Sequence, residues 1–340
     1  MIFGLALNVG EGLDEIRRIA SLTVGSRIGR VWVSYSVRGR DPFDAASVVA
    51  AANLGLRVGI GALSPYIYCV DEIKSRLLGL VERFGERFDL CLGLGDKRVL
   101  EDLGHKVSHS AFLSLLTHAL KSLRGDLSRR GVRIWLGAQG SKTLALSEYF
   151  DGVLLNHCNV DAVRWALERM GSARWCREVG VSAPSYIYED FEVDMFAYVR
   201  RAALKILAGA SRALARDLNL EAEYKQALTY FKNLMQEEGC EEKIVSEDLV
   251  KSLTITMQAS ALPNYLNSMR GLGVTEVVFG YPISISTAHI EILKSTLARY
   301  VTEGIFSLDP KVPNKIYYSP STAVKCKGLD SSSQRPQDHM

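Results

Sequence analysis

The chain has 340 residues, of which 47 % are hydrophobic and 23 % are charged, so it is expected to fold into a globular protein rather than remain disordered. Its 41 basic and 38 acidic residues leave a net charge of +3. Because the basic residues are scattered, the charge pattern gives no footprint for nucleic acid. The six cysteines have no CxxC spacing, so neither a zinc site nor a disulfide framework is expected, and a cytoplasmic location is favoured.

The apolar segments of the chain predict strands and buried helices rather than targeting or membrane segments. The N-terminal MIFGLALNVGEG has no positively charged lead-in, so we expect a first strand and not a signal peptide. The longest apolar region, Ala45–Leu63, is interrupted by Asn53 and Arg57. A buried helix followed by a buried strand explains it better than a membrane span, and no membrane partner is expected.

Short apolar runs alternate with helical patterns along the chain. In order, the predicted strands are Ile2–Val9, Val31–Val37, Arg57–Leu63, Phe88–Gly95, Val132–Ala138, Gly152–Asn156, Ala183–Glu189 and Glu276–Pro282. The helical patterns that follow the first six and the last strand are Leu13–Leu22, Phe43–Leu54, Cys69–Phe84, Ser110–Leu123, Lys142–Phe150, Asp161–Met170 and Thr287–Val301. Eight buried strand–helix units predict an α/β fold, a closed (β/α)8 barrel, with a doubly wound open sheet as the alternative.

The unit between the seventh and eighth predicted strands is much longer than the others. Residues 191–275 contain amphipathic patterns at Met195–Leu214, Glu221–Glu238 and Ser246–Met257, and Pro263 begins another short helix. We expect a helical insertion that packs on the barrel, within a single domain covering residues 1–318. Residues 319–340 are polar and are expected to be disordered.

The loop after the fifth predicted strand is the first candidate site, because chemistry in a barrel lies at the carboxyl ends of its strands. Gly137–Lys142 has the sequence GAQGSK and leads directly into a helix. Glycines let a ligand approach the backbone, and a helix N-terminus offers unpaired N–H groups. The loop therefore suits a phosphate. A tight turn in which Ser141 caps the helix is the alternative.

Other strand ends carry weaker signals. After the fourth strand, the segment GLGDK (Gly93–Lys97) lacks the third glycine of a dinucleotide fingerprint, although Lys97 is placed to meet an anion. After the third strand, Ser64-Pro65-Tyr66 forms a turn, and Tyr66 and Tyr68 either line a pocket or pack at its rim. His157 and Cys158 follow the sixth strand, where His157 is either functional or simply packed.

One histidine pair has a spacing that metal ligands can use. His105 and His109 are four residues apart, but no third ligand is evident nearby. We interpret both as surface histidines, and no metal is expected.

Three segments together resemble the bacterial-luciferase-like flavin and deazaflavin oxidoreductases. They are LCLGLGDKRVLEDLG (Leu90–Gly104), IWLGAQGSKTLALSEYFDGVLLN (Ile134–Asn156) and GVTEVVFGYPI (Gly273–Ile283). The Ser64-Pro65-Tyr66 turn is similar to the family's Asn-Pro-Tyr turn. The segments occur in the family's order and the length matches. Within the family, the sequence resembles the archaeal deazaflavin-dependent enzymes that reduce methylene-tetrahydropterins.

The resemblance implies a (β/α)8 barrel with a late insertion and a cofactor at the carboxyl end of the barrel. It implies coenzyme F-420 as that cofactor, with FMN as the alternative, and a backbone bulge behind the cofactor ring that is often a non-proline cis peptide. The cofactor-binding residues implied are Leu63 and Ser64 at the bulge, Gly95, Asp96, Lys97, Gly137, Ala138, Gln139, Gly140 and Ser141 around the phosphate, and Asn156 below the ring. The family also implies a homodimer.

Two positions depart from the family pattern. The reductases have a glutamate in the first strand, where this chain has Gly4–Leu7, and an acidic residue at the end of the second, where it has Ser34-Tyr35-Ser36. Carboxylates there would serve as proton donors or substrate anchors. Tyr35 and Ser36 are the candidate catalytic residues in their place.

Three hypotheses about function follow from these observations. The first is hydride transfer between F-420 and a methylene-tetrahydropterin or a related small-molecule substrate. The second is an FMN-dependent monooxygenase or reductase. The third is a non-catalytic homologue that binds a cofactor or partner, and it rests on the two missing carboxylates.

Overall fold

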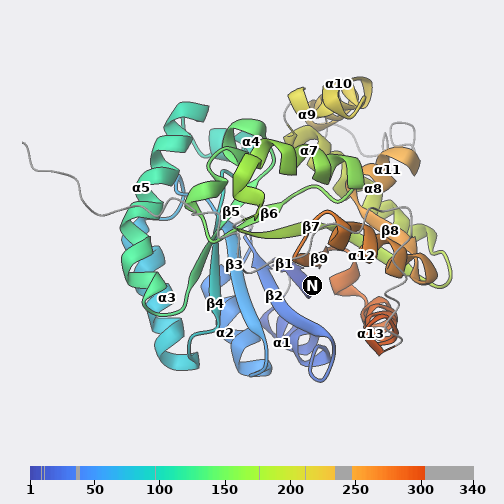
Figure 1. The fold of residues 1–340 in the computed structure, drawn as a ribbon, viewed down its shortest axis with the longest axis horizontal. Coiled ribbons are helices and arrows are strands. Elements are labelled where there is room, and N and C mark those ends of the chain that lie inside the picture. The colour runs from blue at the N-terminus through green and yellow to red at the C-terminus, as the bar shows by residue number, and fades with distance from the viewer. Residues whose placement is uncertain are drawn as a thin grey trace, which may run out of the picture. The chain divides into compact units, whose positions relative to one another are not determined.

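The computed structural model describes residues 1–302 except positions 9, 11, 36–38, 96, 176, 211 and 234–246. The strands are β1 (Ile2–Asn8), β2 (Ile28–Ser34), β3 (Arg57–Leu63), β4 (Phe88–Leu92), β5 (Arg133–Ala138), β6 (Gly152–Leu155), β7 (Glu178–Tyr188), β8 (Ile255–Gln258) and β9 (Glu276–Gly280) (Figure 1). The first helices are α1 (Leu13–Leu22), α2 (Pro42–Ala52), α3 (Val70–Phe84), α4 (Lys97–Asp102), α5 (His109–Ser128), α6 (Ser141–Leu144) and α7 (Val160–Met170). They are followed by α8 (Val193–Gly209), α9 (Arg212–Asp217), α10 (Glu221–Asn233), α11 (Glu247–Leu253), α12 (Leu262–Gly271) and α13 (Thr287–Thr302).

The parallel strands close into a barrel. Strands β1 to β6 pair in chain order, β6 pairs with β7, β7 with β9, and β9 with β1. The predicted eight-stranded barrel is therefore confirmed, and the open sheet is excluded. A ninth strand, β8, pairs with the last residues of β7, Ser185–Tyr188, outside this ring.

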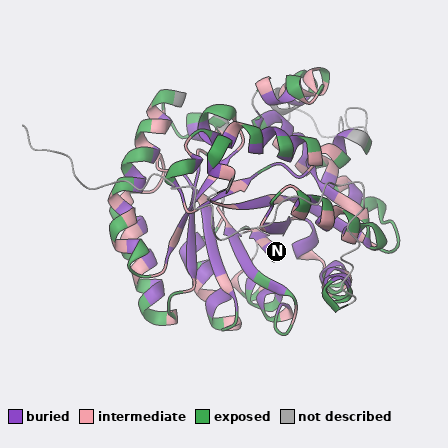
Figure 2. Ribbon diagram, in the orientation of Figure 1, coloured by how far each residue is buried: buried purple, intermediate pink, exposed green. Residues whose placement is uncertain are grey.

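The strands form because their side chains are buried on both faces. All five residues of β4 and all five of β9 are buried, as expected for a sheet covered by helices. Figure 2 shows the barrel strands buried over most of their length, while the surrounding helices carry their exposed residues on the outside. No helix in the described residues is long and apolar enough to cross a membrane.

Helix ends follow local capping chemistry. The Asp41 side chain accepts hydrogen bonds from the N–H groups of Phe43 and Asp44, and Pro42 occupies the first turn of α2. Ser108 caps α5 and Asn159 caps α7 in the same manner. These caps fix where each helix leaves the barrel rim.

Two strands begin earlier than the sequence predicted. We expected the second strand to start at Val31 and the seventh at Ala183, whereas β2 starts at Ile28 and β7 at Glu178. The missed residues include Arg30 and Glu178, whose charges broke the apolar pattern. Their charges are accommodated by ion pairs inside the barrel.

The insertion differs from the expected run of helices. The predicted helix Met195–Leu214 is broken into α8 and α9, and Ser246–Met257 is helical only as far as Leu253. Residues Ile255–Gln258 form β8 instead, because the β-branched Thr254, Ile255 and Thr256 favour a strand beside β7.

Smaller boundary errors occur elsewhere. The predicted helix Lys142–Phe150 is the short α6 followed by a 3-10 turn at Ser147–Tyr149, and the fourth strand ends at Leu92 rather than Gly95. Helix α12 begins beside Pro263 as predicted. The end of the predicted helix Glu221–Glu238 and the predicted tail at residues 319–340 lie outside the described residues.

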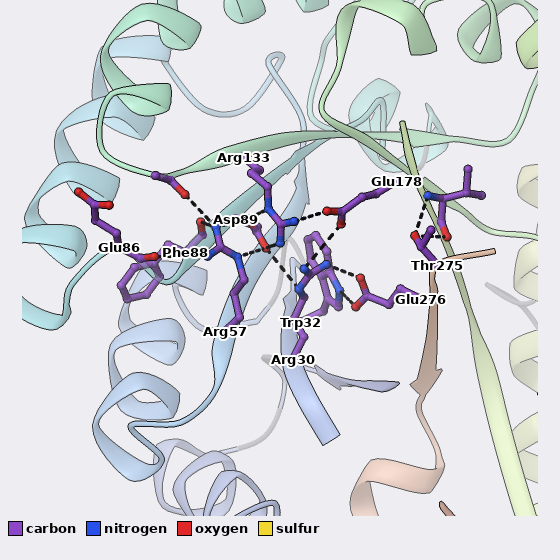
Figure 3. Close-up of polar contacts among 12 residues, drawn as sticks. Arg30, Trp32, Arg57, Glu86, Phe88, Asp89, Arg133, Glu178, Thr275 and Glu276 are labelled. Atoms are coloured by element: carbon purple, nitrogen blue, oxygen red, sulfur yellow. Dashed lines mark hydrogen bonds and ion pairs between the residues drawn. The ribbon is translucent and has the colours of Figure 1, made fainter. Parts of the chain in front are cut away.

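A buried charge cluster fills the amino-terminal half of the barrel. Arg30 is 1 % exposed and pairs with Glu276 and with Asp89, whose Oδ2 lies 3.3 Å from Arg30 Nε. Asp89 also pairs with Arg57 at 2.8 Å and with Arg133 at 3.0 Å. Figure 3 shows Asp89 lying between these arginines, with Arg133 also reaching Glu178. Ion pairs thus connect strands on several sides of the barrel.

The cluster continues into two tryptophans. The Arg30 guanidinium lies 4.9 Å from the ring centroid of Trp135 and 5.6 Å from that of Trp32. Trp32 Nε1 donates a hydrogen bond to Glu276 Oε1 at 2.9 Å. Together these large side chains occupy the amino-terminal half of the barrel interior.

The two fully buried carboxylates in the cluster, Asp89 and Glu276, differ in their proton affinity. Burial raises the pKa of Glu276 to about 7, although Arg30 and the Trp32 hydrogen bond oppose the rise. Burial also favours the protonated form of Asp89, but hydrogen bonds from Arg57 and Arg133 and the charge of Arg30 hold its pKa below the usual range. Asp89 is therefore the ionised centre of the cluster, and Glu276 depends on Arg30.

We expect Arg30→Met to lower the free energy of unfolding by about 3–5 kcal/mol at pH 8, because the buried Glu276 loses the guanidinium that pairs with its carboxylate. The loss should be smaller at pH 6. Without Arg30 the pKa of Glu276 rises further, so the folded variant keeps a proton that the unfolded chain releases near the ordinary pKa of 4.5. The variant therefore loses stability as the pH rises from about 4.5, the pKa of Glu276 in the unfolded chain, to the raised pKa of Glu276 in the folded variant. Denaturant unfolding at both pH values measures the effect.

The exposed Arg129 provides a matched control, since Arg129→Met should change stability by less than about 0.5 kcal/mol. The double variant Arg30→Met/Glu276→Gln should lose less than the sum of the two single losses. An equal loss of stability in Arg30→Met at pH 6 and pH 8, or strictly additive losses in the double variant, would contradict the conclusion that Glu276 depends on Arg30.

Candidate functional site

A cleft of about 690 Å³ opens at the carboxyl ends of the barrel strands. Its walls come from the ends of β1, β2, β6, β7 and β9 and from one face of α8. The lining residues are Ala6, Asn8, Ser34, Tyr35, Asn156, Ser182, Ala183, Pro184, Tyr198, Arg201, Ala202, Lys205, Ile206, Gly280 and Tyr281. This is the end of the barrel that the sequence analysis predicted for the site.

Two of the predicted site residues, Tyr35 and Asn156, line this cleft. The Tyr35 ring packs edge-on against Tyr68 with centroids 5.3 Å apart, and burial raises the Tyr35 pKa above its ordinary value. Tyr35 therefore stays protonated at neutral pH and can donate a hydrogen bond. Asn156 is exposed at the end of β6. Ser36, the other candidate catalytic residue, lies outside the described residues.

The backbone irregularity of β3 lies before the predicted position. The resemblance placed a bulge at Leu63-Ser64, but the cis peptide joins Gly61 and Ala62, and the pairing with β4 shifts between Ile60 and Leu63. Gly61 has φ +145°, and a Cβ there would lie 2.4 Å from the Cys91 carbonyl oxygen, so only glycine fits. The bulge is therefore inside the strand, within the barrel wall.

The glycines at the ends of β4 and β5 are explained by this bulge. A Cβ at Gly93 would lie 3.0 Å from the Ala62 Cβ, and one at Gly137 would lie 3.1 Å from it. Ala62 thus fills the space that side chains at these positions would need. Leu63 and Ser64 are buried beside it, and the Leu63 carbonyl accepts a hydrogen bond from the Gly93 N–H at 3.0 Å.

The predicted phosphate loop joins β5 to α6. Gly137 and Ala138 end the strand, and Gly140 is the helix N-cap with φ −95° and ψ 153°. Ser141 is the first helical residue, and no side chain caps the helix, so the alternative role of Ser141 as a cap is wrong. The loop is instead open to an external partner.

The donors of this loop fit an anionic group. The Gln139 side-chain nitrogen is buried without a hydrogen-bond partner among the described residues. The first N–H groups of α6 have no acceptor within the helix. Ser141 and Lys142 are exposed and add a hydroxyl and a positive charge. The loop therefore has the donors that a cofactor phosphate requires, although α6 has only four residues.

His157 is hydrogen-bonded to the backbone of this loop. It is buried, its Nε2 lies 3.0 Å from the Gln139 carbonyl oxygen, and its ring packs edge-on against Trp165. Burial lowers the His157 pKa to about 4, against the opposing effect of its hydrogen bonds to backbone groups of Gln139 and Asn156. His157 is thus neutral and donates to Gln139. Its contacts are those of a packed histidine that positions the loop.

The remaining predicted residues lie at the ends of β3 and β4. Gly95 has φ +79°, and Lys97, 57 % exposed, begins α4 with its Nζ 3.4 Å from Glu101 Oε1. Asp96 lies outside the described residues. None of Leu63, Ser64, Gly95 and Lys97 lines the cleft, nor do residues 137–141. The structure therefore divides the predicted residues between the cleft and the neighbouring rim.

The other aromatic and histidine side chains at this end of the barrel pack against one another. Tyr68 packs against Phe43 as well as Tyr35, and His105 lies beside the ring of Tyr66. The described residues contain no group of three or more histidine, cysteine or acidic side chains arranged to hold a metal.

The sequence analysis missed the cleft wall formed by α8. Tyr198, Arg201 and Lys205 are three or four residues apart and so share one helix face. Their spacing was visible in the sequence, but it looked like the solvated side of an amphipathic helix. Among the described residues that line the cleft, none is acidic, so the two missing family carboxylates are not replaced there.

Comparisons with known proteins give relatives of matching length. The chain is 25 % identical to 5,10-methylenetetrahydromethanopterin reductase of Methanolobus tindarius over 319 residues, covering 83 % of this chain and 95 % of the relative. It is 22 % identical to the enzyme of the same name from Archaeoglobus fulgidus, covering 83 % and 94 %. No protein-family model matches the chain.

Solved structures share the fold. The coenzyme F-420-dependent tetrahydromethanopterin reductase of Methanopyrus kandleri superposes with a TM-score of 0.76 at 16 % identity, over 88 % of this chain and 99 % of that one. A Baeyer–Villiger monooxygenase component from Pseudomonas putida, in complex with FMN, gives 0.59 at 11 % identity, over 88 % and 98 %.

The barrel fold thus agrees with solved structures aligned over most of their length. The chain is a distant homologue of the methylenetetrahydromethanopterin reductases and resembles the luciferase-like oxidoreductases.

Proposed function

We propose that this protein transfers a hydride between coenzyme F-420 and a methylene-tetrahydropterin or a related unsaturated substrate. The observation that carries the proposal is the cleft at the carboxyl end of the barrel, which lies beside a loop with unpaired donors. The homology to two methylenetetrahydromethanopterin reductases supports the same reaction. FMN is the alternative cofactor, because a protein of the same fold binds it.

In this proposal the chain binds and shields the reactants, and the cofactor carries the chemistry. A bound deazaflavin supplies or accepts the hydride. The residues Gln139 to Lys142 would hold its phosphate, and His157 keeps the Gln139 carbonyl in place. The strand ends around Ala62 would contact its ring. Tyr35 donates a hydrogen bond to the substrate from the β2 side of the cleft.

The experiment that tests the proposed function is a hydride-transfer assay. Purified protein is mixed with reduced F-420 and methylene-tetrahydromethanopterin, and oxidation of the cofactor is followed by absorbance. Turnover that requires both reactants supports the proposal. Cofactor binding without turnover would favour the non-catalytic hypothesis, and turnover with reduced FMN alone would move the protein to the flavin-dependent branch.

We expect F-420 to bind at least about tenfold more tightly than FMN, which corresponds to about 1.4 kcal/mol. Beyond its phosphate, F-420 carries an acidic tail that FMN lacks. The exposed Lys97 and Lys142 can attract that tail, with Lys97 only partly neutralised by Glu101. Titration of the apo-protein with each cofactor at one salt concentration measures the two affinities. Equal affinities, or tighter binding of FMN, would refute this preference.

Gly140→Val should weaken F-420 binding about tenfold or more, because a branched side chain would occupy the space for the phosphate oxygens. The fold should survive, since φ −95° and ψ 153° are available to valine. Gly29→Val is the matched control: Gly29 lies exposed on β2, away from the cleft, and a Cβ there meets only Ile2, at 3.7 Å. Circular dichroism checks the fold of both variants. If Gly140→Val binds F-420 as tightly as Gly29→Val does, the loop is not part of the cofactor site.

Tyr35→Phe should lower kcat about tenfold or more for the substrate that the hydride-transfer assay identifies, because the protonated hydroxyl is lost. The affinity for F-420 should change less than about threefold, since the ring packing on Tyr68 is kept. Because burial raises the Tyr35 pKa, the wild-type kcat should not fall from deprotonation of this group below pH 10. Unchanged kcat in the variant would reduce Tyr35 to a packing residue.

A further inference from the structure

We infer that the wall of the cleft formed by α8 recognises an anionic group, a carboxylate or a phosphate, on the substrate. The two residues that perform this recognition are Arg201 and Lys205. The inference deepens the proposed function and rests on it, because it takes the cleft to be the substrate site.

Helix α8 has two faces with different surroundings. Phe196, Val199, Ala203 and Leu207 are buried in a second apolar cluster with residues of α10, α11 and β7. The opposite side presents Tyr198, Arg201, Ala202, Lys205 and Ile206 to the cleft. The buried face therefore fixes the orientation of the helix, and the cationic face is a built part of the cleft wall.

Aromatic contacts fix the cationic face further. The Tyr198 ring packs edge-on against Tyr281 with centroids 6.1 Å apart, and Tyr281 directly follows β9. The Arg201 guanidinium lies 5.7 Å from the Tyr198 ring centroid. These contacts tie the helix to the barrel rim and place the Arg201 guanidinium beside the Tyr198 ring, which limits the entropy lost when it binds a ligand.

The charged side chains that line the cleft are all positive among the described residues. Arg201 and Lys205 are the charged residues among its described lining, and Lys205 makes no ion pair with any other described residue. The rest of the lining consists of small, amide, hydroxyl and aromatic side chains. Such a surface attracts a carboxylate or phosphate and offers no counter-charge to a cation.

The barrel order indicates which ligand meets these cations. The ring of strands places the loop after β5 opposite β1 and well away from β9, whereas α8 packs on β7 and faces the ends of β9, β1 and β2. A cofactor phosphate at the loop after β5 would therefore be held two strands round the barrel from β7, on which α8 packs. The α8 wall is left to the second ligand, the substrate.

The test compares wild-type protein with the double variant Arg201→Gln/Lys205→Gln, with Lys225→Gln on α10 as a charge-matched control outside the cleft. Inorganic phosphate, folate and the uncharged dimethyl ester of folate are titrated at low salt into protein saturated with F-420, so that the loop after β5 is occupied, and F-420 is titrated separately. Circular dichroism checks the fold of each variant. We expect the double variant to bind phosphate and folate about tenfold more weakly, while the ester and F-420 change less than about twofold. High salt should reduce the advantage of folate over its ester.

The outcomes separate the two proposals. Equal phosphate affinity in the wild type and the double variant would overturn the assignment of the α8 wall. A loss of F-420 affinity as large as that for phosphate would also overturn it, because the wall would then bind the cofactor. If phosphate binding depends on α8 but neither folate nor its ester binds, the anion site on α8 is supported and the proposal of a tetrahydropterin substrate is rejected.

Discussion

The position of the site depends on one buried arginine. Arg30 lies inside the barrel, pairs with Asp89 and Glu276, and stacks near Trp32 and Trp135. A barrel of this size must fill its interior with side chains, and here the amino-terminal half is filled by paired charges and indole rings. The cleft lies at the carboxyl end, where small residues such as Ala6 and Ala62 replace the bulky ones.

The carboxyl end is divided between two kinds of surface. On the β3–β5 side, the bulge at Gly61-Ala62 packs against Gly93 and Gly137, and the adjoining loop offers backbone and amide donors. On the β7–β9 side, α8 contributes tyrosine and two cations. A rigid apolar floor with donors at one edge suits a flat ring with a phosphate, whereas a cationic wall suits a ligand that approaches from outside. The division is what an enzyme with one cofactor and one substrate requires.

Much of the fold could be predicted because the barrel strands are short apolar runs, and most of them are followed by segments with the apolar periodicity of a helix. The charged strand starts could not, because Arg30 and Glu178 become compatible with burial only when Asp89, Glu276 and Arg133 meet them across the barrel. Similarly, β8 follows from pairing with β7, which no local pattern reports. Tyr35 and Asn156 were predicted from the family resemblance, and both line the cleft. Arg201 and Lys205 were missed because only the tertiary position of α8 distinguishes them from solvated residues. Ser36 and Asp96 lie outside the described residues and stay predictions.

The most direct measurement is a crystal structure of the protein with F-420 bound. The account predicts the phosphate against Gln139–Lys142, the ring against the bulge at Gly61-Ala62, and the cleft between Tyr35 and α8 left open for the substrate. A cofactor whose phosphate or acidic tail lies on Arg201 and Lys205, or whose ring lies away from the bulge, would contradict it.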